Sequence, residues 1–228
     1  MSSDPVAEKI VRGRRKYRLV DVFLRLDRVY ETGDILRKRL GNRFDRAVFE
    51  ALDTGKKKGM VLDLTPFSLC GMEIAKQNQD FGVVSLQESK KHTEISRKFA
   101  EEDIVSMDWR VGKPEDLPFS DNSFDLVVSA FDLHGWEDPL KALGEIERVM
   151  RRGGKAVILD LRRDRWRLLY LPALLYTWFM GGLWLFRKAK FAFRSSYNPG
   201  EMEKLIEFLK LEDWNVKKGS YYLIVRKC

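Results

Sequence analysis

Asp132 and His134 are the residues of this sequence whose side chains are best suited to moving a proton. They follow FDLVVS at 124–129, an apolar run typical of a strand that is buried on both faces of a parallel sheet. Because the ordinary pKa of histidine is close to neutrality, His134 is the best candidate for a general base, and Asp132 would orient His134 or an acceptor. The alternative is that His134 only begins a helix and that Asp132 is a solvated loop residue.

Metal and disulfide chemistry have little support in the sequence. Its two cysteines, Cys70 and Cys228, and its two histidines, His92 and His134, show no zinc-type ligand spacing. Because one cysteine lies in mid-chain and the other at the last position, a disulfide framework is not indicated and a reducing compartment is expected. His92 lies in a charged stretch and is expected at the surface, whereas Cys70 is expected to be a small buried residue. The N-terminal residues lack the apolar core of a signal peptide, which predicts a cytoplasmic location.

The elements that must position these residues alternate along the chain between short apolar runs and segments with helical periodicity. Such alternation predicts an α/β domain, a doubly wound parallel sheet with right-handed crossovers and helices on both faces. Its ligand is expected at the carboxyl ends of the strands. The predicted strands are 60–64, 82–86, 105–109, 124–129 and 155–161, and the predicted helices are 70–79, 90–101 and about 140–149.

Both ends of the chain depart from this alternation. A helix is predicted at 199–211, followed by a β-hairpin whose strands are 214–218 and 221–226. Residues 1–55 predict a helical N-terminal extension. A length of 228 residues suits one domain, here 56–228, together with that extension.

An ordered set of short motifs occupies residues 112–160. The motifs are Glu115 to Phe119, Asp121 to Asp125, Leu133-His134, Asp138-Pro139 and Arg152-Gly153-Gly154. In type and order they resemble the class I S-adenosylmethionine-dependent methyltransferases, and most closely the branch with quinone-biosynthesis and other small-molecule enzymes. The resemblance implies a Rossmann-like sheet of that type ending in a C-terminal β-hairpin, S-adenosyl-L-methionine as cofactor, and no metal.

The resemblance also implies where the cofactor would bind. The implied cofactor-binding residues are Asp63, Thr65, Gln87, Glu88, Pro114, Glu115 and Ser129. Asp63 would close the first strand. By spacing, Gln87 stands where the family has an acidic residue that accepts hydrogen bonds from the ribose hydroxyl groups, and a one-residue bulge would let Glu88 serve instead.

The sequence departs from the family pattern at the implied cofactor contacts. Thr65, Phe67 and Leu69 stand where the family has glycines, whose backbone can approach the cofactor closely, and Pro66 removes an amide donor. Lys113 replaces an aspartate and cannot accept a hydrogen bond from the adenine amino group. Three interpretations follow: the cofactor binds in an altered pose, a different ligand has replaced it, or the scaffold survives without methyl transfer.

The formal net charge of +8 is concentrated in two segments. Residues 9–18 carry +6 and residues 162–194 carry +7, so that the rest of the chain carries −5. Basic segments can grip phosphates, but no aromatic stacking pattern or base-reading module accompanies these. A nucleic-acid partner is therefore disfavoured, and RNA methylation is a minor alternative.

Residues 168–186 contain no charged side chain and lie within an insert at about 162–198. Their length approaches the roughly 30 Å thickness of a bilayer core. A single span is excluded, because the hairpin must pair with strands that precede the insert. Two interpretations remain: a peripheral element that contacts an anionic membrane, or a lid helix over the acceptor pocket or in a dimer interface.

Either interpretation places apolar walls over the acceptor site. The sequence therefore predicts methyl transfer to a hydrophobic small-molecule acceptor, such as a quinone, a lipid or a cofactor precursor. The alternative is a catalytically degenerate protein of the same fold that serves as a membrane-binding or partner-binding module. The sequence does not indicate an oligomeric state.

Overall fold

The computed structural model describes residues 58–165, 193–219 and 222–227, with Leu175, Arg187 and Lys190 as single residues between them. The helical extension predicted at 1–55 and most of the apolar insert lie outside the described residues. Within the part that is described, no helix is long and apolar enough to cross a bilayer.

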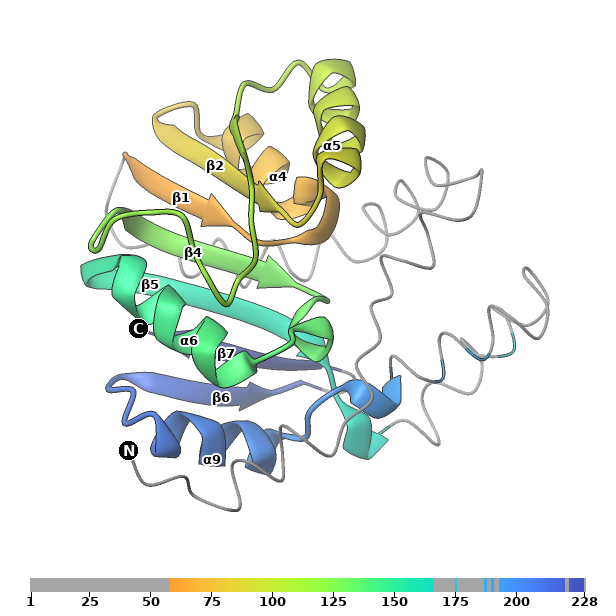
Figure 1. The fold of residues 1–228 in the computed structure, drawn as a ribbon, viewed down its shortest axis with the longest axis vertical. Helices are drawn as coiled ribbons and strands as arrows, with labels where there is room; N and C mark the ends of the chain where they lie inside the picture. The colour runs from red at the N-terminus through yellow and green to blue at the C-terminus, as the bar shows by residue number, and fades with distance from the viewer. Residues whose placement is uncertain are drawn as a thin grey trace.

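A seven-stranded sheet in the order β3-β2-β1-β4-β5-β7-β6 forms the centre of the domain (Figure 1). The strands are β1 (Gly59–Asp63), β2 (Phe81–Gln87), β3 (Asp108–Val111), β4 (Phe124–Ala130), β5 (Met150–Leu161), β6 (Trp214–Lys218) and β7 (Tyr222–Lys227). Strands β3, β2, β1, β4 and β5 are parallel to one another, and β7 pairs antiparallel with both β5 and β6. The predicted doubly wound sheet with a C-terminal hairpin is therefore confirmed.

Helices cover both faces of this sheet. The helices are α4 (Leu69–Gln77), α5 (Lys90–Glu102), α6 (Pro139–Val149) and α9 (Pro199–Phe208), with short 3-10 turns η1 (Pro66–Ser68), η2 (Leu133–Gly135) and η3 (Arg163–Arg165). Apolar residues of α6 and α9 share one core cluster with the sheet, whereas those of α4 belong to a second cluster. Strand order reverses between β1 and β4, which places the expected ligand site at their carboxyl ends.

Capping residues determine where the helices begin. The Asp138 carboxylate accepts hydrogen bonds from the backbone of Leu140 and Lys141 at the start of α6. Asn198 and Glu201 form a reciprocal capping box at the start of α9. These caps hold the loops that enter α6 and α9 in a fixed conformation.

Three local predictions were wrong. The third strand begins at Asp108, because the backbone of Val105 instead donates to Ala100 and closes α5. Strand β5 begins at Met150 and not at residue 155, because Met150 already pairs with Phe124 of β4, before a shift of register that precedes the pairing of Lys155 with Leu126. His92 is only 7% exposed, since its ring packs edge-on against Phe67 with centroids 6.0 Å apart.

Candidate functional site

Asp63 anchors the turn at the carboxyl end of β1. Its carboxylate is fully buried and accepts hydrogen bonds from the backbone of Thr65 at 2.8 Å and of Gly71 at 2.7 Å. Burial raises the pKa of Asp63 to about 6, although hydrogen bonds from Thr65 and Gly71 oppose the shift. A side chain at position 71 would place its Cβ 2.6 Å from Asp63 Oδ2, so the close approach requires glycine.

The segment that follows, residues 65–68, has a backbone conformation that usually needs glycine. Phe67 and Ser68 have φ angles of 60° and 56°, in the left-handed region. The Phe67 ring packs edge-on against the rings of His92 and Phe99. Phe67 and Ser68 therefore adopt a backbone conformation typical of glycine although both carry side chains.

Gln87, the last residue of β2, is bound to this segment. Its Nε2 donates hydrogen bonds to the carbonyl oxygen of Thr65 and to the hydroxyl groups of Ser68 and Ser85, at 3.0–3.1 Å. Its Oε1 accepts from the backbone of Phe67 at 3.2 Å, and Ser68 and Ser85 also hydrogen-bond to each other. All of these groups are buried, so the amide of Gln87 is engaged by the protein itself.

A small cavity lies at the carboxyl ends of β1, β2 and β3. The residues that line it are Leu64, Pro66, Leu86, Gln87, Glu88, His92, Gly112, Pro114 and Asp132. Four of them, Gln87, Glu88, Pro114 and Asp132, are among the predicted site residues. The cavity has a volume of about 20 Å³, whereas ligand pockets usually measure about 300–1,000 Å³. In this conformation the residues that line it do not leave room for a nucleoside cofactor.

His134, which follows β4, and Asp160, near the end of β5, form a buried pair. His134 Nδ1 lies 2.8 Å from Asp160 Oδ1, and the backbone of His134 donates to Asp160 Oδ2 at 2.6 Å. Neither side chain is exposed. When Nδ1 carries the proton and donates it to the carboxylate, Nε2 is the basic nitrogen of the ring. The pair can thus present a histidine in one defined tautomer.

Asp132 connects the two parts of the site. It lines the small cavity, lies two residues before His134, and accepts a hydrogen bond from Trp136 Nε1 at 3.0 Å. The sequence had suggested Asp132 as the group that orients His134. The carboxylate bonded to His134 Nδ1 is that of Asp160, at the end of β5.

The remaining predicted residues lie on the loops and strands around the cavity. Glu115 Oε1 accepts from the backbone of Glu137 at 2.6 Å and of Asp138 at 3.2 Å, which ties the loop after β3 to the start of α6. Ser129 is fully buried within β4. Lys113, which stands where the family has an aspartate, forms an ion pair with Glu137, whose Oε1 lies 3.1 Å from Lys113 Nζ.

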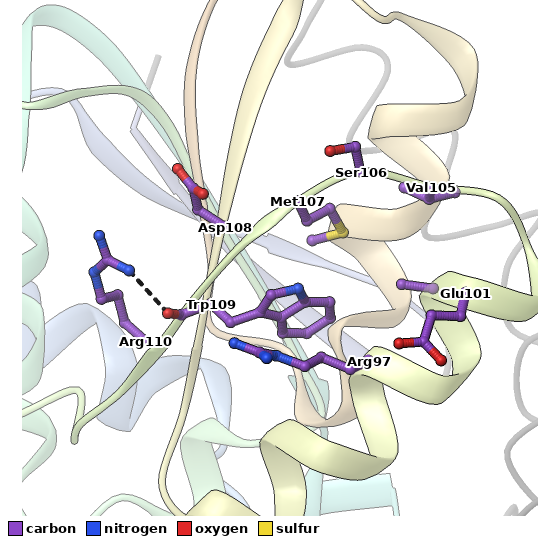
Figure 2. Close-up of a pocket in the computed structure, with 9 residues that line it drawn as sticks. Arg97, Glu101, Val105, Ser106, Met107, Asp108, Trp109 and Arg110 are labelled. Atoms are coloured by element: carbon purple, nitrogen blue, oxygen red, sulfur yellow. Dashed lines mark hydrogen bonds between the residues drawn. The ribbon is translucent and has the colours of Figure 1, made fainter.

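The structure also has a second, larger hollow, and Figure 2 shows the residues that line it. Its volume is about 420 Å³, and it is bounded by the second half of α5, the segment that leads into β3 and β3 itself. Arg97 and Trp109 line it, and Arg110 Nη1 donates to the carbonyl oxygen of Trp109 at 3.0 Å. It shares no lining residue with the carboxyl-end cavity.

Metal binding finds no support in the described part of the chain. No cluster of three histidine, cysteine, aspartate or glutamate side chains that could hold an ion occurs there. The titratable side chains of the candidate site include Asp63, Glu88, Asp132, His134 and Asp160.

The strand order, the antiparallel β7 and the acidic residue that ends β1 together define the fold of the class I methyltransferases. Residues 70–158 match the family described as "Methyltransferase domain". The chain is 30% identical over 203 residues to the demethylmenaquinone methyltransferase of Thermotoga maritima, and the match covers 83% of this chain and 86% of the relative. The chain belongs to the class I S-adenosylmethionine-dependent methyltransferase family.

Other relatives match over shorter segments. The mitochondrial 2-methoxy-6-polyprenyl-1,4-benzoquinol methylase of Leishmania donovani is 28% identical over 57% of this chain and 42% of its own length. The uncharacterized protein YafE of Escherichia coli is 40% identical over 63 residues, and the match covers 25% of this chain and 30% of that protein.

Solved structures share the fold. The plantazolicin methyltransferase BpumL in complex with SAH has a TM-score of 0.69 at 13% identity, covering 98% of both chains. A SAM-dependent methyltransferase of Aquifex aeolicus has a TM-score of 0.54 at 16% identity and covers 79% of this chain and 87% of that one.

Sequence reasoning missed Asp160 and the binding of Gln87 to residues 65–68. Asp160 did carry a signal, as the single acidic residue in the otherwise apolar end of the run 155–161. No local signal indicated that the side chain of Gln87 binds residues 65–68, because its partners Thr65 and Ser68 lie about twenty residues earlier in the chain.

Proposed function

We propose that this protein transfers a methyl group from S-adenosylmethionine to a hydrophobic small-molecule acceptor of the quinone type. The relationship to a demethylmenaquinone methyltransferase over 83% of the chain supports the substrate class. The observation that carries the chemistry is the buried His134–Asp160 pair at the carboxyl edge of the sheet. The cofactor supplies an activated methyl group, so that the protein has to align the acceptor, exclude water and accept a proton.

His134 is the proposed general base. Its Nδ1 is held by Asp160, so Nε2 is the nitrogen that would accept the proton released by the acceptor atom that is methylated. Only a neutral imidazole has a lone pair on Nε2 that can accept this proton. Asp160 is a positioning residue in this proposal.

Glu88 is the proposed carboxylate for the ribose hydroxyl groups. It follows β2 and lines the small cavity, whereas the amide of Gln87 is engaged by residues 65–68. Asp63 and Glu115 would act indirectly, since each holds backbone groups of a loop beside the cavity. Thr65, Pro114 and Ser129 complete the set that we assign to the cofactor side.

We assign the acceptor side to the insert at about 162–198. Arg162 and Tyr197 pair in an isolated parallel bridge, and the backbone of Arg163 donates to Tyr197. The insert therefore leaves and rejoins the domain at one place, just after Asp160. An apolar insert attached there is well placed to enclose a hydrophobic acceptor beside His134, and its basic flanks suit contact with an anionic membrane surface.

Two measurements test this function. Calorimetry with S-adenosylhomocysteine should show binding, and a short-chain demethylmenaquinol should be methylated by the wild type but at least about 100-fold more slowly by His134→Gln. Lys141→Gln, on the exposed surface of α6, is the control and should retain activity. Binding of the cofactor without methylation of any quinol, phenol or lipid acceptor would contradict the acceptor class.

Membrane contact has its own test. Flotation with liposomes that contain anionic phospholipid should carry the protein upward at low salt, and high salt should release it. If the protein stays in the soluble fraction at low salt, the insert acts as a lid alone.

A second candidate function is favoured by the cavity of about 20 Å³. A protein of this fold that had lost its cofactor would keep the sheet and use the insert to bind a membrane or a partner. No binding of S-adenosylhomocysteine at high micromolar concentration would favour this alternative.

A further inference from the structure

We propose that residues 65–68 form a gate that closes the cofactor cavity and that the side chain of Gln87 is the latch that holds the gate shut. The inference rests on the proposed function, since it takes the cavity beside β1 and β2 as the binding place of S-adenosylmethionine. It goes further because it assigns Gln87 to holding the loop instead of binding ribose.

The ends of the gate are fixed by one carboxylate. Asp63 accepts hydrogen bonds from the backbone of Thr65, at the start of the gate, and of Gly71, within the first turn of α4. Both bonds are buried. Residues between these two anchors can therefore change conformation while the strand end and the helix stay in place.

The middle of the gate is held in a strained conformation. Phe67 and Ser68 both lie in the left-handed region, which side-chain-bearing residues adopt at a cost and which persists only when other contacts enforce it. Pro66, immediately before them, lines the cavity. Movement of this middle part would relieve the strain and withdraw Pro66 from the cavity wall.

Gln87 supplies the enforcing contacts. Its amide both accepts from the backbone of Phe67 and donates to the carbonyl oxygen of Thr65, and it donates further to the hydroxyl groups of Ser68 and Ser85. A carboxylate at this position could not donate to Thr65. A glutamine at the end of β2 is thus suited to closing the gate, whereas a glutamate would leave the gate unlatched.

The gate has a consequence for affinity. Because the cavity that the described residues enclose is about 20 Å³, the cofactor has to bind the open conformation. The observed affinity is then the affinity of the open form multiplied by the fraction of molecules that are open. Variants that loosen the latch should bind more tightly.

Ser85→Ala is the primary test, because it removes one hydroxyl from the latch in the middle of β2. It should bind S-adenosylhomocysteine at least about threefold more tightly than the wild type, because the hydrogen bonds that Ser85 makes with Gln87 and with Ser68 are both lost. Gln87→Glu should bind about tenfold more tightly or more. Ile104→Gly is the matched control, since Ile104 also has a left-handed φ of 55° but lies after α5, outside the cavity, and its affinity should equal that of the wild type.

Hydrogen exchange separates gate opening from a new contact between the ligand and the carboxylate that Gln87→Glu introduces. In the absence of ligand, both latch variants should exchange faster than the wild type in the peptide that spans 64–69, and no faster in a peptide from β4. In the wild type, saturating S-adenosylhomocysteine should change exchange of the 64–69 peptide, and this measurement needs no variant to fold.

The outcomes distinguish the two proposals. If the wild type binds S-adenosylhomocysteine, Ser85→Ala and Gln87→Glu bind no more tightly, and exchange at 64–69 is unchanged by ligand, the gate is wrong and the proposed function stands. If neither the wild type nor any variant binds at high micromolar ligand, the cofactor assignment fails and the gate fails with it.

Discussion

Two buried carboxylates, Asp63 at the end of β1 and Asp160 near the end of β5, hold different groups. Asp63 accepts from two backbone amides and holds a loop, whereas Asp160 accepts from the backbone and Nδ1 of His134 and holds a side chain. Both are fully buried. In each case a backbone amide fixes the carboxylate, so the geometry at the site is set by the main chain.

The raised pKa of Asp63 predicts a dependence of stability on pH. The folded pKa is about 6 against an ordinary value of 3.8, so between pH 4 and 6 the folded state holds a proton that the unfolded state has lost. Stability from this group is therefore present below pH 4 and is lost as pH rises through 6. Denaturation in urea should show the wild type losing roughly 3 kcal/mol relative to Asp63→Asn from pH 4 to 7.

The same substitution at an exposed aspartate, Asp80→Asn, controls for the change of residue type. If the free energies of unfolding of the wild type and of Asp63→Asn differ by the same amount at every pH in this range, burial does not disfavour the Asp63 carboxylate.

Asp160→Asn should impair His134 without removing it. An asparagine can hydrogen-bond Nδ1 through its NH₂ group and stabilise the wrong tautomer, so kcat should fall by about 100-fold or more while the affinity for S-adenosylhomocysteine is retained. A kcat equal to that of the wild type would contradict the role of Asp160 in positioning His134.

Helices α5 and α9 are each followed by a residue with a left-handed backbone conformation that is not glycine. After α5, the backbone of Val105 donates to Ala100 and that of Ile104 to Glu101, and Ile104 adopts a φ of 55°. After α9, Lys210 occupies the equivalent place with a φ of 52°. Glycine is common at this position because it lacks the Cβ that makes left-handed backbone unfavourable.

Ile104→Gly should therefore stabilise the protein. The Ile104 side chain is 93% exposed, so little burial is lost, and the relief of backbone strain should add about 1 kcal/mol to the free energy of unfolding. Ile104→Ala, which removes the side chain but keeps the Cβ, is the matched control in urea denaturation. An alanine variant as stable as the glycine variant would contradict the explanation.

The proposed cofactor side and the proposed acceptor side lie at different strands along one edge of the sheet. The small cavity is built by the ends of β1, β2 and β3, whereas the insert is attached after β5, where Arg162 pairs with Tyr197. Asp132 lines the cavity, whereas His134 pairs with Asp160, two residues before Arg162. The arrangement allows either side to be altered with the other left intact.

Replacing residues 166–192 by a short Gly-Ser linker should test this separation. Because Arg162 and Tyr197 already lie side by side, the linker can close without distorting β5, and affinity for S-adenosylhomocysteine should stay within about twofold. The KM for a hydrophobic quinol should rise by about tenfold or more, since its apolar walls are lost. If the affinity for S-adenosylhomocysteine falls by the same factor as the KM for the quinol rises, the insert supports the fold and does not enclose the acceptor.

Local patterns in the sequence were enough to predict much of this fold. Continuous apolar runs predicted strands β1, β2, β4 and β5, because a strand buried on both faces needs apolar residues throughout. The C-terminal helix and hairpin, and the motifs at 112–160, were equally local. The family assignment followed from the same motifs.

The directions in which the polar residues of the site point depend instead on the tertiary structure. Gln87 binds Thr65 and Ser68, which lie about twenty residues before it, His134 pairs with Asp160, 26 residues after it, and His92 is buried under Phe67. No local pattern encodes such contacts. They arise because parallel strands bring their carboxyl ends to one edge of the sheet, where a buried polar group is stabilised by a hydrogen-bond partner from another strand or loop.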